Sequence, residues 1–255
     1  MLQKNIKKNM NYKLQDITLQ FGSLMQIENR TAFFDVFNNK DITQTKELAI
    51  FNKLTKNKKL LIDIGCQYAP LSLSFAKLNP DSVIYAFDGG INPFLTVSQT
   101  KTINGFKNYY IYNNLIGDKD EMVKCFSEPH QSLAINGDDN KLMLTIDTFV
   151  STHDLQPDCI KIDIEGCELK ALKGALNTIQ THRPIIFIEI HPRFIQMYNT
   201  TINDIIQYVS DISYNIIDLN GDIIENYSEV LHNEPTDSHR AIWVPRESNM
   251  KDFQC

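Results

Sequence analysis

Lys59–Pro70 reads KLLIDIGCQYAP, and Val83–Asp88, a little further along the chain, reads VIYAFD. The run Leu60–Ile64 is short and apolar, which predicts a strand buried on both faces. Gly65 then permits a tight turn beside a ligand, and an apolar face at helical spacing follows as far as Leu78. Strand, glycine turn, helix, strand and terminal acid together predict one nucleotide-binding half of a doubly wound α/β sheet.

Two aspartates at the ends of these strands indicate the kind of ligand. Asp88 follows Asp63 by about 25 residues, the spacing at which such an acid accepts hydrogen bonds from both ribose hydroxyls of an adenosine. The turn holds Gly65 but not the further glycines that a pyrophosphate needs. Asp63 would repel a phosphate and suit an ammonium group, so the pattern favours S-adenosylmethionine. A purely structural turn, with Asp63 capping a helix, is the alternative.

The composition is that of an ordinary globular protein. The 255 residues are 42% hydrophobic and 22% charged, which suits one large α/β domain with or without a small extension. The net charge of −6 argues against a broad basic face for nucleic acid, so we expect no nucleic-acid partner.

Cysteine usage and hydropathy indicate the compartment. The five cysteines are odd in number and show no Cys-x-x-Cys spacing, which favours a reducing compartment over a disulfide framework. No apolar run reaches the roughly 18 residues of a membrane span, and none follows the N-terminal lysines as in a signal peptide. We therefore expect a cytoplasmic protein with no membrane span.

The rest of the chain predicts further elements. Residues 1–58 show no strong strand pattern but a helix over 43–56, so we expect a helical extension packed on one edge of the core; a roof over the cofactor site is the weaker interpretation. Strands are expected at 109–112, 122–126, 141–145, 159–166 with its exit, 185–191, 214–219 and 240–244, and helices at 92–104, 147–152, 168–179 and 202–209. Asn136-Gly137 could close a hairpin. A short, helix-poor connection is expected to join the last two strands as an antiparallel edge hairpin, and the tail after Pro245 is expected to fray.

Candidate site residues lie at strand exits, because ligands of open α/β sheets bind beyond the carboxyl ends of the strands. The cofactor-binding candidates are Asp63, Gly65, Cys66, Gln67, Tyr68, Asp88, Gly89, Asn113, Leu115 and Asp163. The catalytic candidates are Asp163, Glu165, Glu189 and His191. A sulfonium cofactor with an ammonium group would offset part of the negative charge gathered there. One of the catalytic candidates would serve as the base, and a His beside carboxylates can do so at neutral pH.

Other interpretations of these residues are less favoured. Asp163, Glu165, Glu189 and His191 could bind a divalent cation in principle, but no short His-x-x-x-His signature supports this, so we expect no metal. Glu165 could instead cap a helix, and His191 could be a satisfied loop residue. Cys66 lacks any sequence hint of a paired His, so we do not expect a nucleophile there.

These motifs make the chain resemble the FkbM family of S-adenosylmethionine-dependent methyltransferases over roughly residues 59–247. The family's Asp-Val-Gly-Ala-Asn-x-Gly is matched by Asp63–Ala69, and its Ala-Phe-Glu-Pro by Ala86–Gly89. Its most specific stretch, Ile-Lys-Ile-Asp-Val-Glu-Gly-Ala-Glu, is met almost letter for letter by Ile160–Glu168, and the next strand by residues 183–191. Gln67 and Ala69 depart from the family's Asn and second Gly.

The resemblance implies an α/β fold of the class I methyltransferase (Rossmann-like) type, with a seven-stranded, mostly parallel sheet, helices on both faces and an antiparallel last strand. The domains would be an N-terminal helical extension (1–58), an S-adenosylmethionine-binding methyltransferase domain (59–247) and a flexible tail (248–255). The implied activity is O-methyl transfer to a hydroxyl of a sugar, glycan or similar polyhydroxylated metabolite, so the partner would be a small-molecule or glycan acceptor; a homo-oligomer is possible.

Two alternatives to this activity stay open at the level of sequence. A non-catalytic S-adenosylmethionine-binding or scaffold protein with the same fold is motivated by the altered first motif. A nicotinamide-dependent oxidoreductase is disfavoured by the missing glycines.

Overall fold

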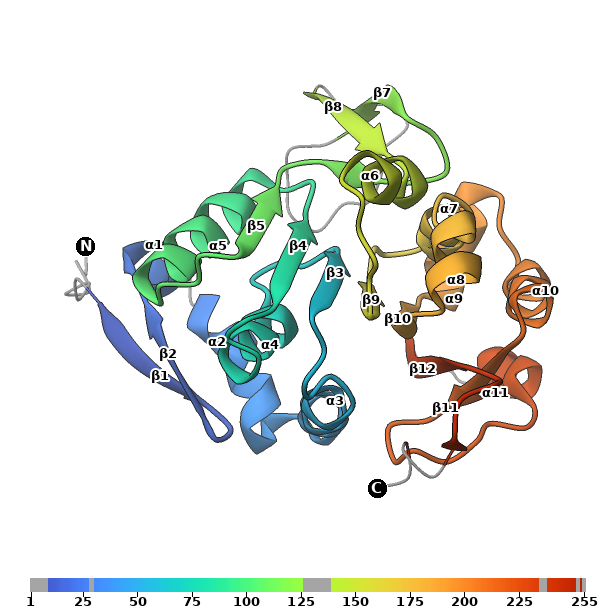
Figure 1. The fold of residues 1–255 in the computed structure, drawn as a ribbon, viewed down its shortest axis with the longest axis horizontal. Helices are drawn as coiled ribbons and strands as arrows, with labels where there is room; N and C mark the ends of the chain where they lie inside the picture. The colour runs from blue at the N-terminus through green and yellow to red at the C-terminus, as the bar shows by residue number, and fades with distance from the viewer. Residues whose placement is uncertain (1–8, 28–29, 126–138, 234–237, 251–252, 254–255) are drawn as a thin grey trace.

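A seven-stranded sheet forms the centre of the computed structural model, which describes residues 9–27, 30–125, 139–233, 238–250 and 253 (Figure 1). The strand order is β11-β12-β10-β9-β3-β4-β5, and β12 runs antiparallel to both of its neighbours while the other pairs are parallel. The predicted mostly parallel sheet with an antiparallel last strand is confirmed. The strands are β3 (Leu60–Ile64), β4 (Val83–Phe87), β5 (Tyr109–Tyr112), β9 (Cys159–Ile162), β10 (Ile185–Ile190), β11 (Tyr214–Ile217) and β12 (His239–Pro245).

Helices cover both faces of this sheet, as predicted, because successive side chains of each strand point to opposite sides. In β3, Leu61 packs into one hydrophobic cluster and Ile62 into the other. The first cluster takes up α3 (Ile42–Leu54), α4 (Pro70–Leu78) and α5 (Ile91–Ile103). The second takes up α6 (Ile146–Thr152), α7 (Glu168–Lys173), α8 (Leu176–His182), α9 (Pro192–Ile195), α10 (Ile202–Ile212) and α11 (Tyr227–Asn233), with η3 (Gln196–Tyr198) after α9.

The N-terminal extension is not purely helical, which corrects one expectation. It begins with an antiparallel hairpin, β1 (Met10–Leu14) and β2 (Ile17–Phe21), before α1 (Ser23–Gln26), α2 (Arg30–Asp35) and η2 (Val36–Lys40). The alternation in β2 carries the signal, since Ile17, Leu19 and Phe21 are buried while the residues between them are exposed. Figure 1 places the hairpin beside α5, with which β2 makes contact.

The helix expected over 168–179 is two helices, α7 and α8, because a long-range cap interrupts it. The carboxylate of Asp147 accepts hydrogen bonds from the backbone N–H groups of Asn177 (3.0 Å) and Thr178 (2.7 Å), at the start of α8. Gly174 fills the break, and a Cβ there would lie 2.0 Å from the carbonyl oxygen of Gly117. Neither contact could be read from the local periodicity.

The C-terminal region corrects two further expectations. Strand β12 lies between β10 and β11, and α11 stands in the connection before it, so β11 and β12 are not a simple edge hairpin. Part of the tail expected to fray packs on the domain. Phe253 is only 7% exposed within the first hydrophobic cluster, and Glu247 pairs with Arg183 at 2.7 Å.

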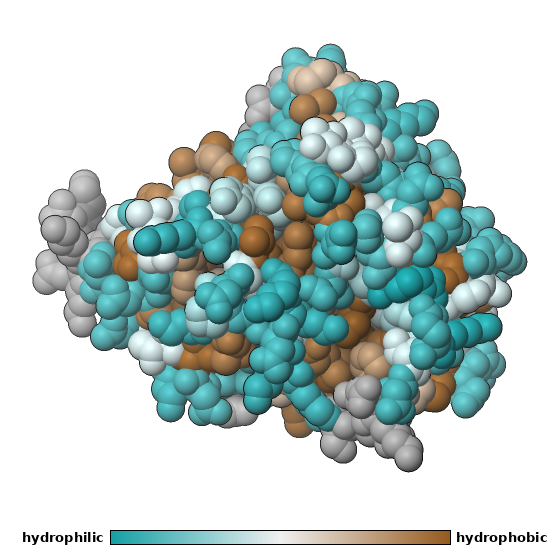
Figure 2. Space-filling view, viewed as in Figure 1, coloured by the Kyte–Doolittle hydropathy of each residue, from teal (hydrophilic) through white to brown (hydrophobic). Residues whose placement is uncertain are grey.

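A small second sheet holds the two short strands expected between residues 122 and 145. It consists of β6 (Leu115–Ile116), β7 (Glu121–Cys125) and β8 (Asp139–Leu144), in the order β6-β8-β7. The hairpin turn suggested for Asn136-Gly137 lies outside the described residues. Hydrophilic residues cover most of the face in Figure 2, and none of the described helices is long and apolar enough to cross a membrane.

Candidate functional site

A row of polar side chains crosses the sheet on the face covered by the N-terminal extension. Asp63 in β3 is in register with Lys161 in β9, and Glu189 in β10 is in register with Arg240 in β12. The residues directly next to these four in sequence, such as Ile62, Ile160 and Ile188, pack into the second hydrophobic cluster, so strand alternation places the four on the other face. The polar row therefore results from the sheet register and not from closeness in sequence.

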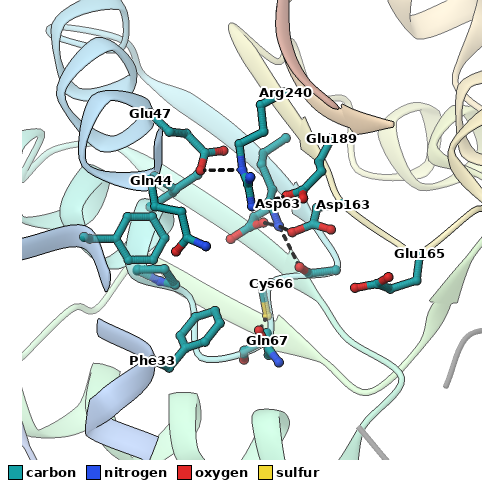
Figure 3. Close-up of a pocket in the computed structure, with 15 residues that line it drawn as sticks. Phe33, Gln44, Glu47, Asp63, Cys66, Gln67, Asp163, Glu165, Glu189 and Arg240 are labelled. Atoms are coloured by element: carbon teal, nitrogen blue, oxygen red, sulfur yellow. Dashed lines mark hydrogen bonds and ion pairs between the residues drawn. The ribbon is translucent and has the colours of Figure 1, made fainter. Parts of the chain in front are cut away.

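Above this row lies a cavity of about 160 Å³, shown in Figure 3. Its lining includes the catalytic candidates Asp163, Glu165 and Glu189. The N-terminal extension contributes the other wall, through Phe33, Phe37, Gln44 and Glu47. Of the two interpretations of the N-terminal extension given by the sequence, plain packing on the core or a roof over the cofactor site, this lining fits the roof.

Gly65 allows the first turn to pass close beneath the next strand exit. Its φ of +74° is in the left-handed region, and an added Cβ would lie 1.9 Å from the carbonyl oxygen of Asp163. The following residues Gln67 and Ala69 also have positive φ, +48° and +61°. These are the two positions where the family pattern has Asn and Gly, residues that adopt this conformation with little strain.

Asp63 is held inside the site and not at its surface. The carboxyl group is 1% exposed, accepts a hydrogen bond from the Ser72 hydroxyl, and lies 3.5 Å from Nζ of Lys161. Burial raises the pKa of Asp63 against the opposing effect of Lys161. Its Oδ1 receives no hydrogen bond from the described residues, which leaves an acceptor inside the cavity wall.

Asp88 anchors the end of the neighbouring strand. Its carboxylate accepts hydrogen bonds from the backbone N–H groups of Gln67 (2.8 Å) and Gly90 (2.7 Å), and burial raises its pKa to about 6. Asn113 donates to the backbone carbonyl of Asp88 (2.9 Å), and Leu115 lies against Gly89, where an added Cβ would be 2.6 Å from Cδ2. Asp63 lines the cavity defined by the described residues, whereas Asp88 does not.

Lys161 connects the first turn with the exit of β9. Its ammonium group donates to the carbonyl oxygen of Gly65 (2.6 Å) and lies 3.4 Å from Oδ2 of Asp163. Burial alone would lower the pKa of Lys161, but the charges of Asp163 and Asp63 outweigh it and raise the pKa. Lys161 is therefore a fixed cation within the site.

Arg240 is a second cation in the cavity wall that pairs with acidic side chains. It lies 3.1 Å from Glu47 in α3 and 2.8 Å from Glu189, joining the extension to the sheet. Burial raises the pKa of Glu47 to about 7 in spite of Arg240, and burial followed by the charge of Asp163 raises the pKa of Glu189. Both acids thus hold protons more tightly than exposed glutamates do.

His191 follows β10 and is almost enclosed. Nδ1 lies 2.8 Å from the fully buried carboxylate of Glu168, while Nε2 faces Glu165 (3.4 Å), Glu189 (3.6 Å) and Asp163 (3.9 Å). Burial lowers the pKa of His191, but the hydrogen bond to Glu168 and the surrounding charges outweigh burial and raise it to about 9. The structure thus brings all four catalytic candidates together.

The remaining cofactor candidates are mainly parts of the turn. Cys66 is buried, and burial raises the pKa of its thiol well above the usual range, which disfavours the thiolate that a nucleophile needs. Tyr68 packs edge-on against Phe33, and the guanidinium of Arg30 lies 5.6 Å from its ring centre.

Sequence reasoning did not select several residues that line the cavity: Phe33, Phe37, Gln44, Glu47, Pro70, Leu71, Lys161 and Arg240. Two of them carried a usable signal, because Lys161 and Arg240 are charged residues within strands that are otherwise buried. The residues of the extension carried none, since their place at the site depends on how α2, η2 and α3 pack.

Comparison with known proteins shows which methyltransferases this chain resembles. Residues 104–216, somewhat under half of the chain, match the family model of the methyltransferase FkbM domain. The resemblance predicted from the sequence is confirmed over that stretch, which contains the Ile160–Glu168 motif. A search of curated proteins finds no match.

Among solved structures, the chain is similar to a methyltransferase FkbM from Methylobacillus flagellatus, with 19% sequence identity and a TM-score of 0.51. The similarity covers 74% of this chain and 44% of that one, so this chain spans less than half of the length of that protein. It is also similar to a precorrin-6y C5,15-methyltransferase from Geobacter metallireducens (12% identity, TM-score 0.44, covering 81% and 89%). A ribosomal protein L11 methylase from Lactobacillus delbrueckii gives 12% identity and a TM-score of 0.46, covering 81% and 79%.

The fold is that of the class I methyltransferases, and residues 104–216 match the model of the FkbM methyltransferase domain. The fold and the matched model imply S-adenosylmethionine as the cofactor. The residues present fit it, because the glycine turn, the unsatisfied acceptor on Asp63 and an excess of carboxylates favour a cationic ligand with hydrogen-bond donors.

Proposed function

We propose that this protein is an S-adenosylmethionine-dependent O-methyltransferase that acts on a hydroxyl of a sugar, a glycan or a similar polyhydroxylated metabolite. The observation that supports it best is the carboxylate-lined cavity at the exits of β9 and β10, where Asp163, Glu165 and Glu189 meet. Ionised carboxylates accept hydrogen bonds from hydroxyl groups and repel anions, so they favour a neutral, hydroxyl-rich acceptor over a phosphorylated one.

The cofactor residues divide between the two sides of the first turn. Asp88 would accept hydrogen bonds from a ribose, and Asp63 and Asp163 would face the positively charged end. S-adenosylmethionine, when bound, supplies a methyl group on a sulfonium centre that is already activated for transfer. The cavity of about 160 Å³ is smaller than the ~300–1,000 Å³ of typical ligand sites, so it can take only part of the cofactor and acceptor together.

The remaining work of the chain is to position the acceptor hydroxyl and to accept its proton. We assign proton acceptance to the carboxylates Asp163, Glu165 and Glu189. Support for this choice over His191 comes from the pKa of the imidazole, which at about 9 leaves it protonated at neutral pH and a poor acceptor. Lys161 and Arg240 would keep two of these carboxylates in place.

The test is methyl transfer from labelled cofactor into a panel of sugars and glycans, with cofactor binding measured separately by calorimetry. Asp88→Asn should weaken cofactor binding at least tenfold, whereas Asp81→Asn, an exposed aspartate in the preceding turn, should leave it unchanged. Wild-type affinity should fall as the pH is lowered through about 6, because protonation removes the acceptor on Asp88.

Each outcome discriminates between the alternatives. Cofactor binding with label in no acceptor would favour the non-catalytic, cofactor-binding protein. Equal affinity in Asp88→Asn and wild type would contradict the cofactor assignment. Undiminished turnover in Asp163→Asn, Glu165→Gln and Glu189→Gln alike would exclude a carboxylate as the base.

A further inference from the structure

Three side chains at the exits of β9 and β10 bring potential metal-ligand atoms together. One ligand atom each from Asp163, Glu189 and His191 lies within 4.8 Å of the others. Asp163 follows β9, Glu189 lies in β10 and His191 directly follows β10, and these strands are parallel neighbours. The cluster therefore rests on two adjoining strands of the central sheet, which fix its geometry better than a loop would.

The orientation of His191 is an observation independent of the acidic cluster. Its side chain is 5% exposed, and Nδ1 is held at 2.8 Å by Glu168, whose carboxylate also accepts a hydrogen bond from the N–H of Gly166. Nε2 consequently points at Asp163 and Glu189, yet makes no hydrogen bond among the described residues. An imidazole oriented by a carboxylate on one nitrogen, with the other aimed at acidic oxygens, is the usual arrangement of a metal-ligating histidine.

The two carboxylates each divide their oxygens in the same way. Asp163 directs Oδ2 to Lys161 (3.4 Å) and Oδ1 toward His191, and Glu189 directs Oε2 to Arg240 (2.8 Å) and Oε1 toward His191. Each acid is thus steadied by a fixed cation through one oxygen and presents the other to a common point.

The charges around this point do not balance. Glu47 is compensated by Arg240, Asp63 by Lys161 and Glu168 by His191. Two more carboxylates share these same cations: Asp163 lies beside Lys161 and His191, and Glu189 lies beside Arg240 and His191. Uncompensated carboxylates in a half-enclosed cavity are costly, and a bound cation removes that cost.

We propose that Asp163, Glu189 and His191 bind a divalent transition-metal cation, which takes the place of the proton on Nε2 of His191. Bonds of about 2.1 Å at tetrahedral or octahedral angles place ligand atoms ~3.0–3.4 Å apart. Nε2 of His191 now lies 3.6 Å from Glu189 and 3.9 Å from Asp163. Side-chain movements of less than about 1 Å would bring both separations into that range. One imidazole with two carboxylates suits Mn²⁺, Fe²⁺ or Zn²⁺.

The site would serve the acceptor, a consequence that rests on the proposed function. Three protein ligands leave coordination positions open toward the cavity, where a hydroxyl of the acceptor can bind and lose its proton more readily. Glu165, whose side chain is 48% exposed and lies 3.4 Å from Nε2 of His191, would then accept that proton.

Mn²⁺ is the probe for the experiment, titrated into chelator-treated, full-length protein and followed by calorimetry and by the loss of free-Mn²⁺ paramagnetic resonance signal. No cofactor or acceptor is present, so the result does not depend on methyl transfer. We expect one saturable site per chain. Asp163→Asn, Glu189→Gln and His191→Gln should each weaken binding at least tenfold, while Glu121→Gln, an exposed acid on β7, should change it less than twofold.

A second measurement covers variants that fail to fold. In crystals of wild-type protein soaked in Mn²⁺, the anomalous difference map should show a peak between Asp163, Glu189 and His191. No saturable binding by wild-type protein, binding that survives all three substitutions, or an anomalous peak elsewhere would overturn the metal site. Methyl transfer that persists without any metal binding would overturn this inference alone and leave the proposed function standing.

Discussion

Gly65 shows how one residue type can set the spacing of a site. The backbone there has φ of +74°, and the position of a Cβ is already filled by the carbonyl oxygen of Asp163, 1.9 Å away. Because the turn lies this close to the exit of β9, Lys161 can contact the carbonyl oxygen of Gly65 and the carboxylates of Asp63 and Asp163 at the same time. A side chain at residue 65 would separate the turn from the exit of β9, and with it the two halves of the site.

Gly65→Ala should therefore cost much more stability than Gly105→Ala. Gly105 has nearly the same φ, +71°, but open space where its Cβ would lie, so it isolates the cost of backbone strain. We expect a loss of about 1 kcal/mol for Gly105→Ala and about 3 kcal/mol or more for Gly65→Ala, measured as the free energy of unfolding in urea. Equal losses would show that the contact with Asp163 gives way without cost.

Among the elements, α3 carries a group that links the extension to the sheet. Glu47 lies on α3 and reaches Arg240 on β12, which also binds Glu189 on β10. Because burial outweighs Arg240 and raises the pKa of Glu47 to about 7, ionising Glu47 at alkaline pH lowers its net contribution to the stability of the fold.

The sign of the resulting pH dependence follows from linkage. A folded-state pKa raised from 4.5 to about 7 means that the folded chain binds the Glu47 proton more tightly than the unfolded chain, so stability falls as the pH rises through that window. Glu47→Gln should make the fall shallower, by about 2 kcal/mol between pH 4.5 and pH 8. Urea unfolding at both pH values checks this, with Glu225→Gln, an exposed acid, as the control. A fall as steep in Glu47→Gln as in wild type would contradict it.

For the whole molecule, described residues of the N-terminal extension pack into a hydrophobic cluster of the central sheet. Phe21, Phe34 and Phe51 are fully buried in the same hydrophobic cluster as Leu61 and Phe187 of the central sheet. We therefore predict that the residues on the two sides of the expected boundary at residue 58 fold as one unit.

A chain that starts at Lys59 should accordingly fail to unfold cooperatively. Removing the extension exposes the apolar face of α4 and of the sheet, which amounts to several large buried side chains at about 1.5–3 kcal/mol each. Circular dichroism during heating should show a broad, non-cooperative change, and the full-length chain should show one sharp transition. A sharp transition in the truncated chain would mean that residues 59–255 form a domain by themselves.

Much of the fold could be predicted because the central strands are short and continuously apolar. Runs such as Leu60–Ile64 and Ile185–Ile190 have few other ways to be buried than in a parallel sheet. Two of the wrong predictions concern long-range contacts: the break between α7 and α8, capped by Asp147, and the insertion of β12 between β10 and β11. The missed hairpin of β1 and β2 is different, because the alternation in β2 is a local signal. The boundaries of the domains and the cytoplasmic location stay predictions.

The sequence by itself determined the α/β class, S-adenosylmethionine as the expected cofactor, and the acidic residues at the carboxyl ends of the strands. These features depend on local apolar runs, turns and motifs. Only the tertiary structure decided that Lys161, Arg240 and Glu47 hold those acids in place, and that Nε2 of His191 faces Asp163 and Glu189. The reason is physical: strand register and helix packing bring together groups that lie far apart in the chain, and no local pattern records those distances.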